Sequence, residues 1–389
     1  MSNDTHTEVT SQSWFSRLGK AFKGIILGGV LFLVAFPLLF WNEGRAVHRA
    51  QALEEGSGMV ISVAANSVDA ANDGKLVHVS GKATTNETLS DPTFGITAKG
   101  LKLKRKVEMY QWMETSKSKT EKKLGGGTET VTTYSYAKKW SGSAIDSGKF
   151  KNPDNHSNPA VMPYQSEYYV AGEVELEAYS MPKFVVDQIN SYSNLPIRAG
   201  IQLPEEIKDT ARNQNGTLYI GGSPAAPQVG DIRVSYEVIK PLDVSLIAKQ
   251  VGNTFEPYRT RSGGSIQLMQ TGIHSAESMF ESAETSNVIL TWILRFVGFI
   301  IMALGLKLVF KPLPVIADVL PIAGNIIGAG TGLVANILAA AFSLITIAIA
   351  WVFYRPLIGL ALIAIAVVFI YFTKVRMKKA GTRAVPEMA

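Results

Sequence analysis

Polar and charged residues stand at the edges of the apolar stretches of this chain, where their side chains can form strong hydrogen bonds. Asn42, Glu43 and Arg45 directly follow the first apolar stretch, Arg295 lies within the second, and Arg355 separates the last two. Hydrogen bonds that involve ionised groups are roughly twice as strong as those between neutral groups. We expect these side chains to meet at one membrane surface and to join a soluble domain to its membrane anchor.

The neighbours of these residues complete the set of interaction candidates. Trp292 is typical of a membrane interface. Arg295 is then either a functional charge inside the membrane or, as we favour, a side chain that extends toward that interface. Pro356 disfavours helix at Arg355 and predicts a tight turn there. The candidates are Asn42, Glu43, Gly44, Arg45, Trp292, Arg295, Tyr354, Arg355 and Pro356.

Residue types that support catalysis or metal binding do not form a recognisable motif in this sequence. The five histidines are not grouped at metal-ligand spacing. Gly263-Gly264-Ser265 follows Arg259 and suits either an anion cradle or, as we favour, a turn. Glu173, Glu175 and Glu177 present oxygens that a divalent cation prefers, but strand alternation explains their spacing better. We therefore predict no catalytic residues, no cofactor and no metal site.

Composition excludes several other classes. The chain has 389 residues and no cysteine, which rules out disulfides and cysteine nucleophiles and favours a bacterial source. Its net charge is +6, and much of this charge lies beside the apolar stretches, as in membrane proteins generally. The expected partners are therefore the lipid bilayer and other membrane proteins, not nucleic acid.

Four apolar stretches surround one long polar block and predict the domain organisation. Each is close to the roughly 20 residues that cross a bilayer as a helix. We expect a multi-pass α-helical membrane protein with four spans and a large β-rich α+β extracytoplasmic domain between spans 1 and 2. The predicted segments are 1–23 (tail), 24–41 (span), 42–286 (domain), 287–310 (span), 311–331 (interfacial), 332–353 (span), 355–373 (span) and 374–389 (basic tail).

Flanking charges predict the orientation of these spans. Arg17, Lys20 and Lys23 precede the first stretch, and a basic segment at 374–389 follows the last. The positive-inside bias places both termini in the cytoplasm and the polar block in the periplasm or lumen. A cleavable signal peptide is the alternative for 24–41, but its apolar run is too long and no cleavage site follows it.

The segment 313–331 is the ambiguous part of this layout. It is apolar but contains repeated proline and glycine, so we interpret it as an interfacial or re-entrant segment, or a linker. Gly324, Gly328 and Gly332 recur every four residues and would allow another helix to approach closely.

Alternating patterns in the polar block predict strands at 77–83, 101–107, 107–114, 131–140, 172–179, 231–238 and 265–270. The triple glycine at 125–127 predicts a turn between two of them. Helix is expected at 182–192 and 275–284. Lys102, Lys104 and Lys106 form a basic ladder that would pair with the acidic ladder at 173–177, although two separate solvated faces are the favoured alternative.

Several motifs in order along the chain resemble the LUMA family, also called the transmembrane protein 43 family. They lie at 42–46 (Asn-Glu-Gly-Arg-Ala), 107–112, 133–136, 229–235, 275–280, 291–295 and 353–357. The resemblance implies a membrane scaffold that self-associates and binds other membrane proteins, and it implies no enzymatic activity. Eukaryotic members lie in the endoplasmic reticulum and nuclear envelope, whereas a bacterial member would lie in the inner membrane.

We therefore expect a non-enzymatic, homo-oligomeric membrane scaffold. One alternative is a membrane-bound enzyme with a site at the junction of domain and membrane, near His48. The other is an oligomeric pore or transport component. A deep polar pocket at the junction would favour the enzyme.

Overall fold

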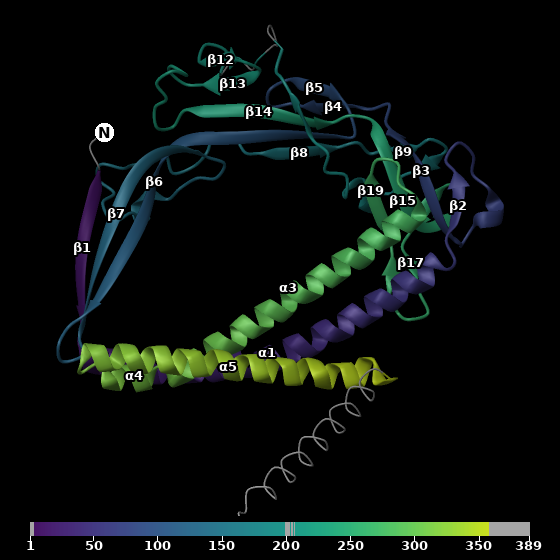
Figure 1. Cartoon of the computed structure of the whole chain (residues 1–389). Helices are drawn as coiled ribbons and strands as arrows, with labels where there is room; N and C mark the ends of the chain where they lie inside the picture. Colours follow the sequence, from purple (N-terminus) through teal and green to yellow (C-terminus); the bar gives the residue numbers. More distant parts are fainter. Residues whose placement is uncertain (1–3, 199–202, 204, 206, 358–389) are drawn as a thin grey trace, which may run out of the picture. The chain divides into compact units, whose positions relative to one another are not determined.

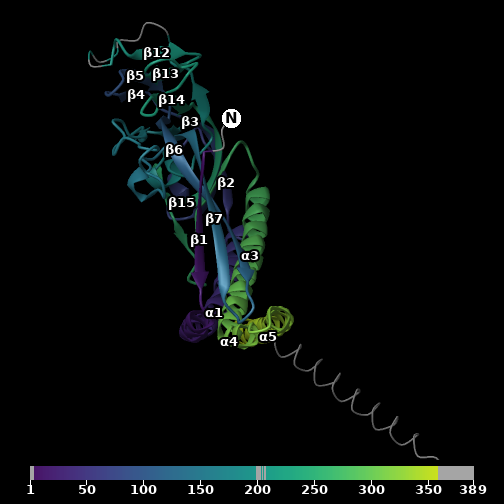
Figure 2. The ribbon, with the colours of Figure 1, turned by 90° about the vertical axis from the view of Figure 1, so that its left-hand side faces the viewer.

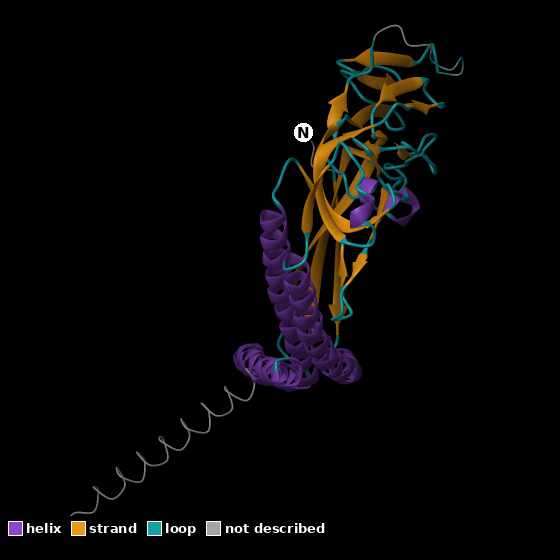
Figure 3. Cartoon of the chain, turned by 90° about the vertical axis from the view of Figure 1, so that its right-hand side faces the viewer, coloured by secondary structure: helices purple, strands orange, loops and turns teal. Residues whose placement is uncertain are grey.

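The computed structural model describes residues 4–198, 203, 205 and 207–357, and these residues form two compact units. The strand-rich unit comprises the N-terminal ten residues, 52–121 and 129–283. The helical unit comprises 11–51, 122–128 and the chain from 284 onward. The large polar block therefore folds mainly as one β-rich unit, and the apolar helices form the other (Figure 3).

An eight-stranded sheet is the larger of the two main sheets in the strand-rich unit. Its strand order is β1-β7-β6-β14-β13-β12, with β8 added to β6 and β11 added to β14 (Figure 1). The strands are β1 (Thr5–Gln12), β6 (Lys102–Lys122), β7 (Thr128–Ser141), β8 (Glu167–Val170), β11 (Ser193–Leu195), β12 (Ala211–Gln214), β13 (Thr217–Ile220) and β14 (Ile232–Ile239).

A seven-stranded sheet completes the core of this unit. Its order is β10-β9-β3-β15-β16, with β19 on β15 and β2 on β3. The strands are β2 (Ile61–Ala64), β3 (Leu76–Thr84), β9 (Glu175–Leu176), β10 (Tyr179–Ser180), β15 (Leu242–Val251), β16 (Thr254–Glu256) and β19 (Leu268–Thr271). Two small pairs are β4 (Thr88–Asp91) with β5 (Ile96–Lys99), and β17 (Tyr258–Arg259) with β18 (Ser265–Ile266).

Strand β14 shows how the alternating pattern builds the core. Its side chains alternate between buried and half-buried positions, and Val234 lies opposite Val107 on β6 and Leu218 on β13. Residues of both main sheets belong to one buried apolar cluster. The predicted strand at 231–238 is confirmed, and so is the glycine turn, since Gly125 and Gly126 take positive φ between β6 and β7.

The two predicted charge ladders do not pair, because they lie in different sheets. Lys104 faces Glu237 of β14 instead, with Nζ and Oε2 2.9 Å apart. Lys102 is buried and donates to the main-chain oxygens of Asp187 and Ile189. Glu175 belongs to β9, in the seven-stranded sheet. The predicted helix at 182–192 is also shorter than expected, since α2 covers only Lys183–Val186.

Three long apolar helices form most of the helical unit. They are α1 (Trp14–Ser57), α3 (Ala276–Phe310) and α5 (Pro321–Tyr354), with the short α4 (Pro312–Ala317) between the last two. By length and composition, three helices among the described residues are able to cross a membrane. Four spans were predicted. The fourth, at 355–373, lies almost wholly outside the described residues.

The predicted interfacial segment at 311–331 does not form a separate element. Its first part is α4, and its second part is the beginning of α5, which starts at Pro321 rather than at 332. Proline suits the first position of a helix, because no partner for its missing N–H is needed there. Gly324 is buried against Asp318, whereas a side chain at Gly332 would meet nothing.

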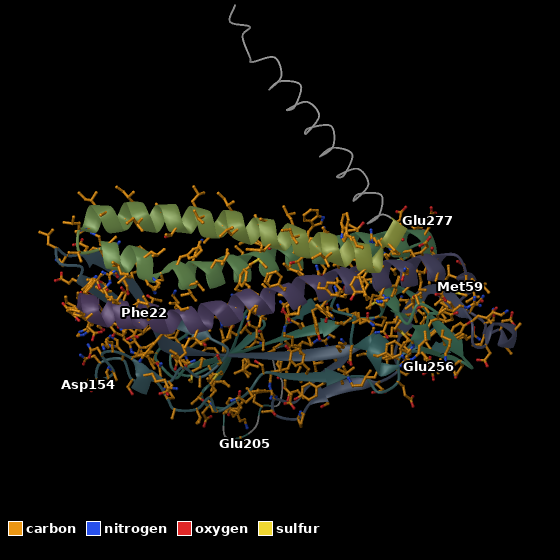
Figure 4. The ribbon with its side chains drawn as sticks, turned by 90° about the horizontal axis from the view of Figure 1, so that it is seen from below. Phe22, Met59, Asp154, Glu205, Glu256 and Glu277 are labelled. Atoms are coloured by element: carbon orange, nitrogen blue, oxygen red, sulfur yellow. The ribbon has the colours of Figure 1, made fainter. Side chains whose placement is uncertain are left out.

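Helices α1 and α3 approach each other closely through two glycines that the sequence did not single out. A Cβ atom added to Gly28 would lie 2.6 Å from the Gly305 oxygen, and one added to Gly305 would lie 2.7 Å from the Gly28 oxygen. Small residues at such crossings let main chains come into contact in membrane proteins. Figure 4 shows the three long helices side by side.

Candidate functional site: a polar junction between three helices

Glu43 lies at the centre of a group of polar side chains that joins the three long helices. We call this group the polar junction; its members are Asn42, Glu43, Arg45, Asn287, Thr291, Arg295 and Trp351. Asn42 and Glu43 are almost completely buried, at 0% and 2% exposed. All seven residues belong to the helical unit.

Glu43 binds donors from two other helices. Its Oε1 accepts from Nε of Arg295 at 2.7 Å, and its Oε2 accepts from Nη2 of Arg295 at 2.8 Å. Oε2 also accepts from the indole Nε1 of Trp351 at 2.7 Å. The paired geometry of guanidinium and carboxylate gives strong, directional hydrogen bonds. A single carboxylate therefore fixes α1, α3 and α5 against one another.

Asn42 and Arg45, which are one turn apart on α1, form the second half of the junction. The Asn42 amide donates to the main-chain oxygen of Thr291 at 3.1 Å. Arg45 donates to Oδ1 of Asn287 and to Oγ1 of Thr291, both at 2.9 Å. Asn287 in turn donates to the main-chain oxygen of Ala46. These bonds satisfy polar groups that would be costly to leave unpaired in an apolar environment.

Aromatic rings surround the charged pair. The Arg295 guanidinium carbon lies 4.7 Å from the ring centre of Trp292 and 5.7 Å from that of Trp351. Such cation–π contacts offset part of the cost of removing a cation from water. The ring of Tyr354 occupies the space beside Gly44, where a Cβ atom would lie 2.5 Å from the ring.

The structure brings together most, but not all, of the predicted junction residues. The expected contact of Glu43 with Arg295 is present. The expected contact with Arg355 is not: the Arg355 side chain is exposed, and α5 ends at Tyr354 before it. Pro356 is exposed as well.

Sequence reasoning missed three members of the junction. Thr291 lies one turn and Asn287 two turns before Arg295 on α3, so helical spacing alone would have placed them on the same face. Trp351 is 308 residues from Glu43, and no local pattern points to that contact.

A second polar cluster lies at the other end of the long helices and is called here the hairpin-tip cluster. Arg17 and Lys122 both form ion pairs with Asp318, which is 1% exposed. Lys122 also donates to Oδ1 of Asn325 at 2.7 Å, and the Trp14 indole donates to the main-chain oxygen of Val315. The tip of the β6–β7 hairpin thus contacts both the beginning of α1 and the α3–α5 connection. Its full membership is Trp14, Arg17, Lys122, Gly125, Gly126, Val315, Asp318, Val319 and Asn325.

The strand-rich unit has its own buried ion pair. Asp91 accepts from Arg105 at 2.6 Å, from Tyr169 at 2.9 Å and from Tyr236 at 2.5 Å. Burial by itself raises the pKa of the Asp91 carboxyl, but these hydrogen bonds and the charge of Arg105 outweigh it and hold the pKa below its ordinary value. Burial raises the pKa of Tyr236, and its bond to Asp91 raises it further. The tyrosines therefore remain neutral donors.

Side chains that suggested other chemistry have structural contacts. His48 packs against the ring of Tyr354, 6.0 Å between ring centres. The glycine segment near 263 is a turn between β17 and β18, in which Thr260 N–H donates to the Gly264 oxygen. Within the part of the chain that the structure describes, no group of three or more histidine, aspartate or glutamate residues is placed to hold a metal ion.

Comparison with known proteins gives the family of this chain. A family model described as "Transmembrane protein 43" matches residues 109–356. The rat protein of that name is 34% identical over 97% of this chain and 96% of its own length, and the human protein is 33% identical over 96% and 95%. The fruit-fly homologue is 30% identical over 90% and 94%.

No solved structure matches this chain. The sequence likeness nevertheless covers nearly the whole chain, and the family-model match includes Arg295 and Trp351 of the polar junction. By its sequence, this integral membrane protein belongs to the transmembrane protein 43 family.

Proposed function

We propose that this protein is a membrane scaffold without catalytic activity. Its apolar helices hold it in the bilayer, and its β-rich domain contacts further copies of the chain and other membrane proteins. The observation that carries the proposal is the ion pair of Glu43 and Arg295, which ties three helices into one rigid anchor. An anchor whose helices are tied together in this way suits a protein that organises others in the membrane.

The character of the junction supports a structural role. Both oxygens of Glu43 accept hydrogen bonds, one from Arg295 and the other from Arg295 and Trp351. A general base must instead reach the proton of a substrate. Truncating one partner of a buried pair leaves an uncompensated charge, which costs about 3–5 kcal/mol. Such an arrangement suits an anchor that must not change shape.

The proposal is tested by chemical crosslinking in native membranes, followed by affinity capture and native mass spectrometry in detergent. We expect the full chain to be recovered as an oligomer together with specific membrane proteins. The Glu43→Gln variant should lose most of this assembly. The matched control is Lys119→Gln, because Lys119 is 81% exposed and its ion pair with Glu121 is exposed as well. A strict monomer that captures no specific protein would refute the scaffold.

A further inference from the structure

The outward face of the eight-stranded sheet carries a pocket of about 410 Å³. Its floor comes from β6, β14, β13 and β12, which follow one another in the sheet (Figure 1, Figure 2). Side chains alternate along β14, so Val234 and Tyr236 enter the core whereas Arg233 and Ser235 line the pocket. All the described lining residues belong to the strand-rich unit. The pocket is therefore a feature of that unit by itself.

Two rows of side chains cross this floor from strand to strand. In the first row, Arg233 lies opposite Glu108 on β6 and opposite Tyr219 on β13. In the second row, Gln214 on β12 lies opposite Thr217, two residues before Tyr219. Residues two apart on a strand point to the same face of the sheet. The pairing of the strands thus places all five side chains on one surface.

The charges that line the pocket are paired with each other. Nε of Arg233 donates to Oε2 of Glu108 at 2.7 Å, and Lys106 pairs with the other carboxylate oxygen at 3.3 Å from outside the pocket. Burial by itself raises the pKa of Glu108, but its bonds to Arg233 and Lys106 outweigh burial and hold the pKa below its ordinary value. Because the lining cation already has an ionised partner, the pocket suits an uncharged polar ligand better than an ion.

Four uncharged polar side chains in the pocket are available to such a ligand. Gln214, Asn215, Thr217 and Ser235 make no side-chain hydrogen bond within the part of the chain that the structure describes. They provide two amides and two hydroxyls, and each of these groups can both donate and accept. Asn215 and Gly216 take positive φ in the two-residue turn between β12 and β13, as regular hairpin turns require. The amide of Asn215 is therefore carried by a defined turn.

An aromatic side chain forms one wall of the pocket. Trp140 lies near the end of β7, with its ring centre 5.2 Å from that of Tyr110 and 6.1 Å from that of Tyr219. The Arg233 guanidinium carbon lies 4.7 Å from the centre of the same ring. Among the described residues, the indole N–H of Trp140 has no acceptor. The wall thus offers an apolar surface together with one further donor.

The connection between β13 and β14 forms the opposite wall and contributes Pro224 and Pro227. The Asp231 carboxylate fixes this connection, because it accepts from the Tyr219 hydroxyl and, at 2.7 Å, from the Gln228 N–H. Proline also restricts its own main chain. Both walls are therefore held in place before any ligand binds, which lowers the entropic cost of binding.

We propose that this pocket binds a neutral saccharide. The C–H groups on one face of a sugar ring pack against an aromatic side chain, and the hydroxyls of the sugar exchange hydrogen bonds with amides, hydroxyls and guanidinium N–H groups. The pocket provides each of these partners, and its volume falls in the range of about 300–1,000 Å³ that small-ligand sites occupy. A strand-forming peptide would instead need a free sheet edge, whereas this pocket lies on the face of the sheet. The inference goes beyond the scaffold role and does not rest on it.

The first experiment measures which ligands the full-length chain binds. The protein in phosphatidylcholine nanodiscs is applied to an array of neutral, sialylated and sulfated glycans, and in parallel to an array of proline-rich peptides. We expect binding to a subset of the neutral glycans. The strongest of these is then titrated by calorimetry as a free oligosaccharide, and separately offered as a glycolipid in phosphatidylcholine vesicles, which shows from which source the sugar is bound. An array on which only charged glycans, only peptides or no ligands are bound would overturn the inference.

The second experiment assigns the binding to the pocket. Gln214→Leu and Thr217→Val each remove hydrogen-bonding atoms from a side chain without a partner, so both variants should fold normally and bind the free oligosaccharide about two- to tenfold more weakly. Trp140→Ala should weaken binding by at least about tenfold, as loss of a central aromatic contact does at other interfaces. The matched control is Gln188→Leu, which removes an exposed amide outside the pocket and should bind like the unchanged chain.

The affinities of the two conservative variants decide the outcome. If Gln214→Leu and Thr217→Val both bind the oligosaccharide as tightly as Gln188→Leu, the sugar does not occupy this pocket and the inference fails. None of these measurements depends on whether the protein assembles with partners, so the scaffold role fails or stands separately.

Discussion

Removal of the Glu43 charge offers the most direct test of the polar junction. In the Glu43→Gln variant the Arg295 guanidinium loses its counter-ion among apolar helices, although Trp351 retains an acceptor. Breaking a buried pair in this way costs about 3–5 kcal/mol. Arg295→Met leaves Glu43 uncompensated and should cost a similar amount. The double variant Glu43→Leu/Arg295→Met removes both charges and should be much less destabilised than the sum of the two single changes.

The measurement is a double-mutant cycle on the purified full-length chain in detergent micelles. Unfolding by increasing denaturing detergent can be followed by tryptophan fluorescence, because Trp351 and Trp292 flank the guanidinium. Lys104→Gln is the control: its pair with Glu237 is partly exposed, and such pairs contribute about 0–1 kcal/mol. If the two single effects add without coupling, the carboxylate and the guanidinium do not stabilise the helices as a pair, and the argument for the anchor fails.

Three further outcomes follow from the described contacts. Asp91→Asn should lower the free energy of unfolding of the strand-rich unit by about 3–5 kcal/mol, measured by chemical denaturation, because Arg105 is left without its buried counter-ion. The pKa of Asp91 is lowered in the folded protein, so its contribution to the free energy of unfolding is complete above the unfolded pKa of about 3.9 and is lost as the pH falls through the folded pKa. An acid titration followed by circular dichroism should therefore show unfolding below about pH 4, and this pH dependence should be weaker in Asp91→Asn. Gly28→Leu should lower the stability of the helical unit by at least about 1–3 kcal/mol, because the new side chain would overlap with Gly305. Gly29→Leu is the control, since a Cβ atom added there meets nothing, and its stability in the same detergent assay should equal that of the unchanged protein.

The regular parts of the fold were predictable because their signals are local. Strand β14 alternates apolar and polar residues from Ile232 to Val238, and each long helix contains a long apolar run. The junction was predictable in part for a similar reason. A charged side chain next to an apolar run needs a partner of opposite charge, and few charged side chains lie beside the apolar runs. Glu43 and Arg295 were therefore paired correctly, whereas Arg355 lies beyond the helix end and remains exposed.

The features that escaped prediction depend on contacts between distant parts of the chain. β1 is an edge strand with only Val9 as a strongly apolar residue, so its pattern resembles a polar tail. The contact of Gly28 with Gly305 joins two helices that are far apart in sequence. The sequence does not predict the start of α5, because repeated glycine and proline usually indicate a break in a helix. Glycine is nevertheless frequent in membrane helices, and Pro321 occupies the first helical turn.

The edge position of β1 has a consequence for the synthesis of the chain. Asp4 is made first, yet its partner His156 follows 152 residues later. At 5–20 residues per second, the ribosome needs roughly 8–30 s to produce it. During that time α1 is already available to the membrane-insertion machinery, while the strand before it has no neighbour. The pairing of β1 with this part of the chain can therefore form only after residue 156 has been made, which makes it a late event in biogenesis.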